Sequence, residues 1–214
     1  MAVARVSARE EILGRIRRGL GPVRPEVEVL RAYRRQEPGD PVERFVERAS
    51  DYEATVLRVA AGEVGAAVAA RCRERGAARL AVPDDVPEEW LPVGLEVVRD
   101  SELDAAELDG VDGVLTGCAL AIAETGTLVL DSGARQGRRA LPLVPDYHVC
   151  VVGEEQVVGG VPEAMALIAE ILRASGRAIT FVSGPSATSD IELSRVEGVH
   201  GPRTLEVLVV APMR

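Results

Sequence analysis

The sequence predicts an α/β domain built in three layers around a mixed sheet, preceded by an N-terminal helical arm. Amphipathic helical patterns dominate its first half, and short runs rich in β-branched residues dominate its second half. Strand–helix–strand units also occur, which indicates that some strands are parallel. A length of 214 residues with 47% hydrophobic and 28% charged residues is typical of one large globular domain. We therefore expect an arm over residues 1–40 and a domain over residues 41–214.

The arm begins with a helix and continues as an irregular segment. Ser7 and Glu10 have the spacing of a capping box, which predicts a helix over Ser7–Leu20 that ends at Gly21. The segment Pro22–Pro41 holds four prolines and many charges, so we expect it to be extended. The sequence leaves open whether the arm packs on its own domain or on a partner subunit.

Periodicity and turn residues predict the elements of the domain. Helices are expected at three places, with Gly76 ending the second and Gly176 the third: Pro41–Val59, Gly62–Arg75 and Pro162–Ser175. A short helix is expected at Glu102–Leu108, capped by Ser101. Strands are expected at Ala78–Val82, Glu96–Arg99, Val111–Leu115, Thr127–Leu130, Tyr147–Val152, Gln156–Val158 and Leu205–Val210, with the fifth and sixth of these as a candidate pair.

The stretch Arg177–Glu192 has the pattern of a strand, a turn and a helix start. We expect Ala178–Val182 to be a buried strand that breaks at Ser183-Gly184-Pro185. The hydroxyl residues Ser186 and Thr188 follow, and Asp190 begins a candidate helix. Unpaired N–H groups at a helix start bind anions, so this geometry predicts an anion site. The alternative is an ordinary connection with a Ser or Thr N-cap.

Glu124 is a single carboxylate in an otherwise uncharged run, and Thr125-Gly126-Thr127 follow it. A buried carboxylate must be paired, hydrogen-bonded or protonated, so a raised pKa and a role as general base or nucleophile are one interpretation. A structural Glu bonded to backbone N–H groups or to an Arg is the other. Gly126 lets a ligand or another backbone approach closely.

Two further loops contain candidate residues. His200 lies between Gly198 and Gly201, in a loop that precedes the last strand, and either meets a ligand or caps a turn. Three arginines in a glycine-flanked loop either clamp a carboxylate or phosphate or are solvated surface: Arg135, Arg138 and Arg139. His148 follows a strand pattern and is expected to be structural.

Composition excludes several functions. A net charge of −9 disfavours binding to nucleic acid or to an anionic membrane. The chain has no Lys, which excludes a Schiff-base or P-loop lysine and leaves Arg as the permanent cation. Cys72, Cys118 and Cys150 lack the spacing of a zinc or iron–sulfur site and are expected to be buried thiols. The N-terminus lacks a signal-peptide pattern and no run is long enough to span a membrane, so we expect a cytoplasmic protein without a metal.

Three stretches together resemble the LUD-domain family, in particular its YkgG-like, lactate-utilisation branch: GVLTGCALAIAETGTLVLDS, FVSGPSATSDIE and GVHGPRTLEVLVV. The resemblance extends from about Pro41 to the C-terminus. It implies a fold like that of NagB, ribose-5-phosphate isomerase and the CoA transferases. It also implies a role in bacterial oxidation of L-lactate to pyruvate, together with two partner proteins that carry iron–sulfur motifs. We expect no cofactor in this chain, and clusters only in those partners.

The first hypothesis is therefore an accessory component of lactate oxidation that binds a small anion at the carboxyl ends of strands. Its anion-binding residues are Ser183, Gly184, Ser186 and Thr188, with Thr125, Gly126, Thr127 and Asp190 completing the site. Glu124 acts as acid or base, His200 orients the ligand and Arg203 supplies the countercharge. The alternatives are a free-standing CoA transferase-like or sugar-phosphate isomerase-like enzyme using Glu124, and a regulatory or scaffold protein with a vestigial site. The ligand and the oligomeric state stay open.

Overall fold

The computed structural model describes residues 7–21, 39–189, 195–197 and 201–212. The chain divides into two compact units, Met1–Tyr33 and Arg34–Arg214. The first contains the helix α1 (Ala8–Leu20), which begins with the predicted capping box. The Glu10 N–H donates to Ser7 Oγ at 3.3 Å, and the Ser7 N–H donates to Glu10 Oε2 at 2.9 Å. This reciprocal pair confirms the predicted start of the helix.

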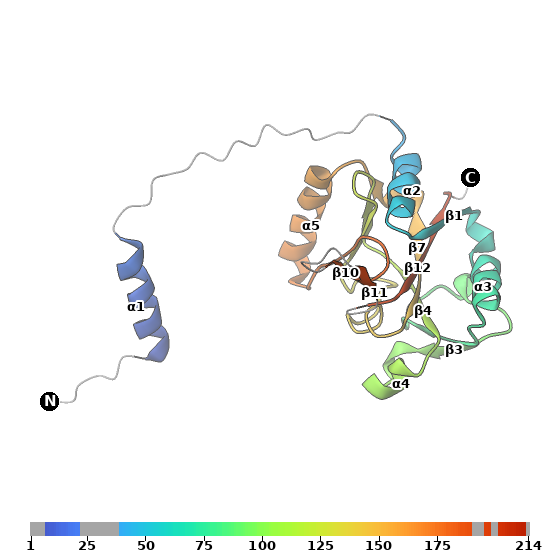
Figure 1. Cartoon of the computed structure of the whole chain (residues 1–214), viewed down its shortest axis with the longest axis horizontal. Helices are drawn as coiled ribbons and strands as arrows, with labels where there is room; N and C mark the ends of the chain where they lie inside the picture. Colours follow the sequence, from blue (N-terminus) through green and yellow to red (C-terminus); the bar gives the residue numbers. More distant parts are fainter. Residues whose placement is uncertain (1–6, 22–38, 190–194, 198–200, 213–214) are drawn as a thin grey trace. The chain divides into compact units, whose positions relative to one another are not determined.

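The centre of the second unit is a six-stranded sheet in which neighbouring strands run parallel (Figure 1). From one edge to the other its strands are β1 (Thr55–Val59), β12 (Thr204–Val210), β7 (Tyr147–Gly153), β4 (Gly113–Gly117), β2 (Arg79–Val82) and β3 (Glu96–Arg99). The two central strands β7 and β12 pair over seven residues, from Tyr147 with Thr204 to Gly153 with Val210. Most of their residues are apolar, as expected for parallel strands covered on both faces.

A second sheet has four strands in the order β8 (Val157–Val158), β5 (Leu120–Ile122), β6 (Thr127–Leu130) and β9 (Thr180–Val182). The pairs β5–β6 and β6–β9 are antiparallel, whereas β5–β8 is parallel. A small antiparallel pair, β10 (Ala187–Ser189) and β11 (Arg195–Glu197), lies outside both sheets. The expected α/β fold with mixed strand directions is therefore present.

Helices cover the sheets on different faces (Figure 1). The helices of this unit are α2 (Pro41–Asp51), α3 (Val64–Arg75), α4 (Ala105–Asp109) and α5 (Val161–Ser175). Side chains of α3 pack on one face of the six-stranded sheet, where Val68 and Cys72 meet Val149 and Leu208. The four-stranded sheet and α2 cover the opposite face. Helix α5 packs on the outer face of the four-stranded sheet through Ala164 and Ile168.

The predicted helix Pro41–Val59 is wrong in its second half. The helix α2 ends at Asp51, and Thr55–Val59 forms the edge strand β1, which pairs with β12 along its whole length. Glu53 adopts a left-handed conformation with φ +68°, which turns the chain between the two elements. The run Thr55-Val56-Leu57 is β-branched and apolar, and pairing with a neighbouring strand outweighs its helical spacing.

Three local predictions also need correction. Asp104, not Ser101, caps the short helix α4, and it forms a capping box with Glu107. The strands at Tyr147 and Val157 do not pair with each other, because β7 belongs to the six-stranded sheet and β8 to the four-stranded one. The strand β5 was not predicted, since three small apolar residues in an uncharged run carry no period of their own.

The strand before the Ser183 turn is not buried. It forms β9 at the edge of the four-stranded sheet, and Phe181 is 51% exposed. After the turn the chain enters the strand β10 rather than passing directly into a helix. The candidate helix start at Asp190 lies outside the described residues. An anion site made by a helix start therefore has no support in the described part of this loop.

Candidate functional site

Four of the predicted site residues meet between the four-stranded sheet and the loop after β9. Thr127 Oγ1 lies 2.7 Å from Thr125 Oγ1 and 2.8 Å from Ser183 Oγ. Thr127 is buried, whereas Ser183 is exposed. The three hydroxyls thus form one hydrogen-bonded chain that ends at the surface beside Gly184. Ser183 lies more than fifty positions after Thr127 in the sequence, and the fold brings their two hydroxyls together.

The two glycines of these motifs lie against the end of α2. A Cβ on Gly126 (φ +61°) is placed 2.4 Å from the Ala49 nitrogen, in the backbone of that helix. A Cβ on Gly184 (φ +85°) is placed 2.4 Å from the Tyr52 carbonyl oxygen. Both positions therefore require glycine for conformation and for space. The close approach anticipated at Gly126 is to another backbone segment.

Glu124 is exposed, so the expectation that it is buried is wrong. It lies in the turn between β5 and β6, and its Oε2 accepts a hydrogen bond from the Val161 N–H at 2.9 Å. Val161 is the first residue of α5, and Gly160, the N-cap of that helix, has no side chain to bond the helix start. Glu124 thus supplies a cap from a distant part of the chain and places a negative charge at the positive end of the helix.

Ser186 and Arg203 make contacts at the amino ends of strands in the six-stranded sheet, whereas carboxyl ends were expected. The Ser186 N–H donates to the Pro202 carbonyl at 2.8 Å, and Arg203 pairs with Asp146 Oδ2 at 3.0 Å. Pro202 and Arg203 precede β12, and Asp146 precedes β7, so both contacts are at the amino ends of these strands. The expected location at strand carboxyl ends therefore applies to the residues that follow β5 and β9, and not to Ser186 and Arg203. Asp190 and His200 lie outside the described residues, as does the side chain of Thr188.

The carboxyl ends of the six-stranded sheet form a separate candidate site. From β2 the chain passes outward to β3, then returns to β4 and continues toward β7 and β12. The direction of winding therefore reverses between β2 and β4. In open α/β sheets the loops diverge at such a reversal and leave a crevice where ligands bind.

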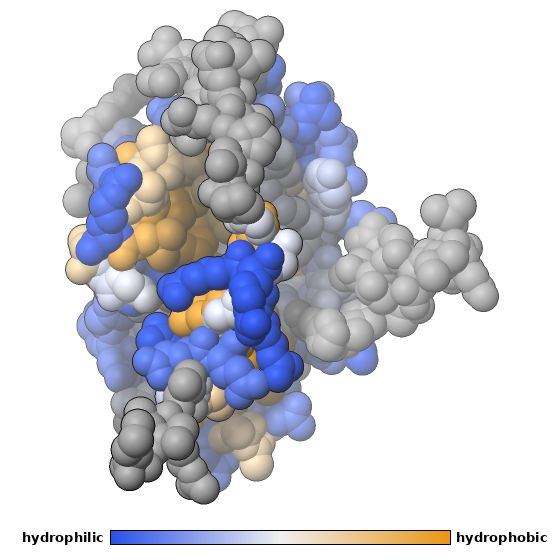
Figure 2. Space-filling view, turned by 90° about the vertical axis from the view of Figure 1, so that its left-hand side faces the viewer, coloured by the Kyte–Doolittle hydropathy of each residue, from blue (hydrophilic) through white to orange (hydrophobic). Residues whose placement is uncertain are grey.

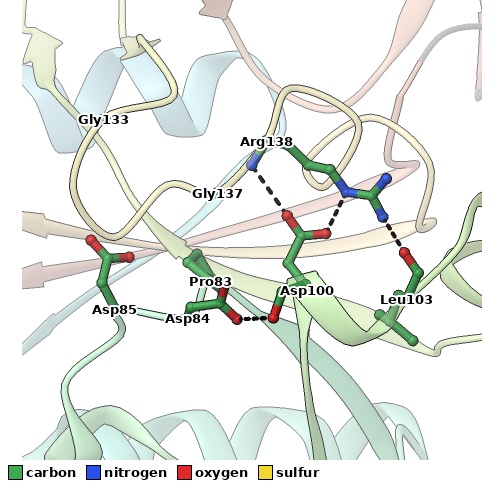
Figure 3. Close-up of a pocket in the computed structure, with 9 residues that line it drawn as sticks. Pro83, Asp84, Asp85, Asp100, Leu103, Gly133, Gly137 and Arg138 are labelled. Carbon is green, nitrogen blue, oxygen red and sulfur yellow. Dashed lines mark hydrogen bonds and ion pairs between the residues drawn. The ribbon is translucent and has the colours of Figure 1, made fainter.

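The loop Ser132–Ala140, which contains the three clustered arginines, crosses this edge of the sheet. A cavity of about 560 Å³ lies between this loop and the ends of β2 and β3 (Figure 3). Buried Asp100 accepts from the Arg138 Nε at 2.7 Å and from its backbone N–H at 3.2 Å. A second guanidinium nitrogen of Arg138 donates to the Leu103 carbonyl at 2.9 Å. Asp84, which accepts from Ser101 at 2.7 Å, also lines the cavity.

A second cavity of about 330 Å³ is also lined by a residue of this loop, Arg135. It is lined by residues at the ends of β1, β7 and β12 together with Trp90 and Arg135. The Arg135 guanidinium lies over the Trp90 ring, 5.5 Å from its centroid. Sequence reasoning identified the arginines but not Trp90, Asp84 or Asp100, which lie on loops with no recognisable spacing.

Two buried titratable groups lie in the strands themselves. Glu206 is fully buried and accepts from Arg71 Nε at 2.7 Å, Arg75 Nε at 2.6 Å and Tyr147 Oη at 3.1 Å. Burial acts to raise the pKa of Glu206, but the hydrogen bonds from Arg71 and Arg75 outweigh it and hold that pKa below its usual value. Sequence reasoning missed Glu206, although a lone carboxylate in an apolar strand was the available signal.

His148 is the second of these groups, and it is structural, as expected. It is fully buried, and its Nε2 lies 2.8 Å from Thr116 Oγ1. Desolvation lowers the pKa of His148 to about 4, so the ring is neutral at pH 7. Its Nδ1 has no hydrogen-bond partner among the described residues.

The three cysteines are free and buried, as predicted. Burial raises the pKa of the Cys72 thiol to about 11, which makes it a poor nucleophile at neutral pH. In the described part of the chain, no group of three or more His, Cys, Asp or Glu side chains is arranged to hold a metal ion. Of the helices in that part, none has the length and apolar character needed to cross a membrane.

Known proteins resemble this chain along most of its length. The LUD domain profile matches residues 42–210. Lactate utilization protein C of Deinococcus radiodurans is 48% identical over 207 residues, which are 95% of each chain. Lactate utilization protein C of Geobacillus kaustophilus is 31% identical over 179 residues, covering 75% of this chain and 72% of the relative. The crystal structure of a DUF162 family protein from Deinococcus radiodurans superposes with a TM-score of 0.69 and 45% identity, covering 79% of this chain and 96% of that one.

Proposed function

This chain belongs to the LUD-domain family, and from that membership we propose that it is a component of L-lactate utilisation. One observation carries the proposal: the 48% identity with a lactate utilization protein C over 95% of both chains. The proposed reaction of the system is the oxidation of L-lactate to pyruvate.

Within that system the chain acts as an accessory component. Oxidation of lactate releases two electrons and two protons, which an acceptor must take up. Cys118 and Cys150 lie close together in one core cluster, but Cys72 is in another, so the three buried thiols do not supply the four ligands of an iron–sulfur cluster. We therefore place the clusters in partner proteins. This chain contributes a binding site for a small anionic ligand.

A growth experiment tests the proposed function. A strain of the source organism that lacks this gene is expected to fail to grow on L-lactate as sole carbon source and to grow normally on pyruvate. Re-expression of the full chain restores growth on lactate. Equal growth of the deletion strain on both substrates contradicts the role in lactate utilisation.

Variants in the same strain test whether the predicted site is needed for growth on lactate. The free-standing enzyme requires Glu124 for chemistry, so Glu124→Gln must abolish growth on lactate. If Glu124 only caps α5, Glu124→Gln keeps an acceptor for the Val161 N–H and growth persists. Ser186→Ala tests the loop after β9 in the same way. Loss of growth in either variant, with unchanged protein level, supports the predicted site; normal growth in both supports a scaffold or a different site.

A further inference from the structure

We infer that the cavity beneath Arg135 and Trp90 binds a small monocarboxylate that carries a neighbouring hydroxyl group. This inference deepens the proposed function and rests on it, because lactate is the simplest chiral member of that chemical class. The cavity opens at the carboxyl ends of β7 and β12, beside the reversal in winding between β2 and β4. Neither Glu124 nor the loop after β9 lines it.

The cation needed for a carboxylate is available at this cavity. Arg135 is exposed, and among the described residues no carboxylate lies within ion-pairing distance of its guanidinium. Its neighbour Arg138 is already bonded to Asp100 and to the Leu103 carbonyl. The Arg135 guanidinium lies over the Trp90 ring, 5.5 Å from its centroid, at the distance of a cation–π contact.

The backbone of Arg135 is held in place. The residue has φ +63°, a conformation that costs a non-glycine residue energy. Its N–H donates to Asp85 Oδ2 at 2.8 Å, and its carbonyl accepts from the Gly117 N–H at 2.6 Å. A Cβ on Gly117 is placed 3.4 Å from the Arg135 Cβ and 3.7 Å from the Trp90 ring. Arg135 and Trp90 therefore both lie next to the end of β4, at van der Waals distance from a Cβ at Gly117.

The remaining lining determines which anion fits. Val151 and Val210 form an apolar wall suited to a methyl group, and a volume of about 330 Å³ is ample for a ligand of lactate's size. Glu89 and Glu155 also line the cavity. Their carboxylates repel an anion in proportion to its charge, so they disfavour phosphate more than a monocarboxylate, and they accept a hydrogen bond from a hydroxyl group. A 2-hydroxy acid satisfies all these groups, whereas a 2-oxo acid has no hydrogen to donate.

Calorimetric titration of the full chain at fixed ionic strength tests the site, with sodium L-lactate, pyruvate, acetate and phosphate as probes. L-Lactate is expected to bind saturably and more tightly than the other three. Arg135→Gln is expected to raise the Kd for lactate about tenfold or more, since a charge-assisted bond is lost. Arg135→Lys keeps the charge and retains part of the affinity. Arg139→Gln is the matched control, because Arg139 is exposed in the same loop but does not line the cavity.

Three outcomes overturn the inference: no saturable heat with lactate, phosphate binding as tightly as lactate, or an unchanged Kd in Arg135→Gln. Thermal melts of each variant verify folding. If Arg135→Gln does not fold, the Kd of Arg135→Lys for lactate replaces it as the test. The growth experiment and the titration test different claims, so each can give a negative result without the other. A deletion strain that grows normally on lactate removes the pathway role. Lactate-dependent growth without lactate binding removes this site and keeps the role.

Discussion

Glu124 and Glu206 are both single carboxylates in apolar stretches, yet their environments are opposite. Glu124 is in a turn at the surface and bonds the start of α5, whereas Glu206 is fully buried between α3 and the six-stranded sheet. In a strand, alternate side chains point to opposite faces, and both faces of β12 are covered. The carboxylate of Glu206 therefore has to be matched from a neighbouring helix, and Arg71 and Arg75, four residues apart on α3, do so.

Glu206→Gln is expected to destabilise the domain by roughly 3–5 kcal/mol, because it removes the anion from a buried pair and leaves two guanidinium groups facing a neutral amide. Urea unfolding at pH 7.5 measures the free energy of unfolding. Asp51→Asn is the control: its ion pair with Arg48 is solvent-exposed, so a change within about 0.5 kcal/mol is expected. Equal effects of the two substitutions contradict this account of Glu206.

At the scale of elements, the motif glycines join α2 to the four-stranded sheet. Gly126, in the turn after β5, faces the backbone of Ala49, and Gly184, in the loop after β9, faces that of Tyr52. The two motifs that carry the family resemblance thus position a helix as well as a surface loop. Their glycines are explained by packing, and the hydroxyl chain of Thr125, Thr127 and Ser183 lies between them.

Gly126→Ala is therefore expected to destabilise the domain by about 2–5 kcal/mol, from the cost of a left-handed alanine and from a clash that moves α2. Chemical denaturation monitored by circular dichroism measures the loss. Gly62→Ala is the comparison, because a Cβ there has no neighbour within 4 Å and its φ is not left-handed. A Gly126→Ala protein as stable as Gly62→Ala is incompatible with the close approach.

At the scale of the whole molecule, the sequence was sufficient for elements defined by local signals. The capping box at Ser7, the glycine stops after α3 and α5 and the strands β3 and β6 lie where predicted. Pairing between distant strands leaves no local signal, so the sequence predicts a helix at Thr55–Val59 and a buried strand at β9. The same limit applies to the cavities: Arg135 meets Trp90, and Arg138 meets Asp100, through loops that lie far apart in the sequence.

The stability of the whole domain is expected to fall as the pH drops from about 6.5 to about 4. The pKa of His148 is about 4 in the folded state, because burial disfavours the charged ring, against 6.5 for an ordinary histidine. Below pH 6.5 the unfolded chain takes up a proton that the folded state refuses, so stability is lost across this interval, by at most about 3 kcal/mol. Below it the lowered pKa of Glu206 acts in the same direction, since that stabilisation is lost on protonation.

Urea unfolding at half-unit steps from pH 7.5 to 4.5 measures the slope. His148→Gln offers the Thr116 hydroxyl a neutral partner that does not titrate, so its stability is expected to vary much less over this range. His200→Gln, which alters the other histidine of the sequence, is expected to keep the dependence of the unaltered chain. A slope that survives in His148→Gln assigns the acid sensitivity to other groups. A slope lost only in His148→Gln shows that one buried, uncharged imidazole between β4 and β12 couples the stability of the domain to pH.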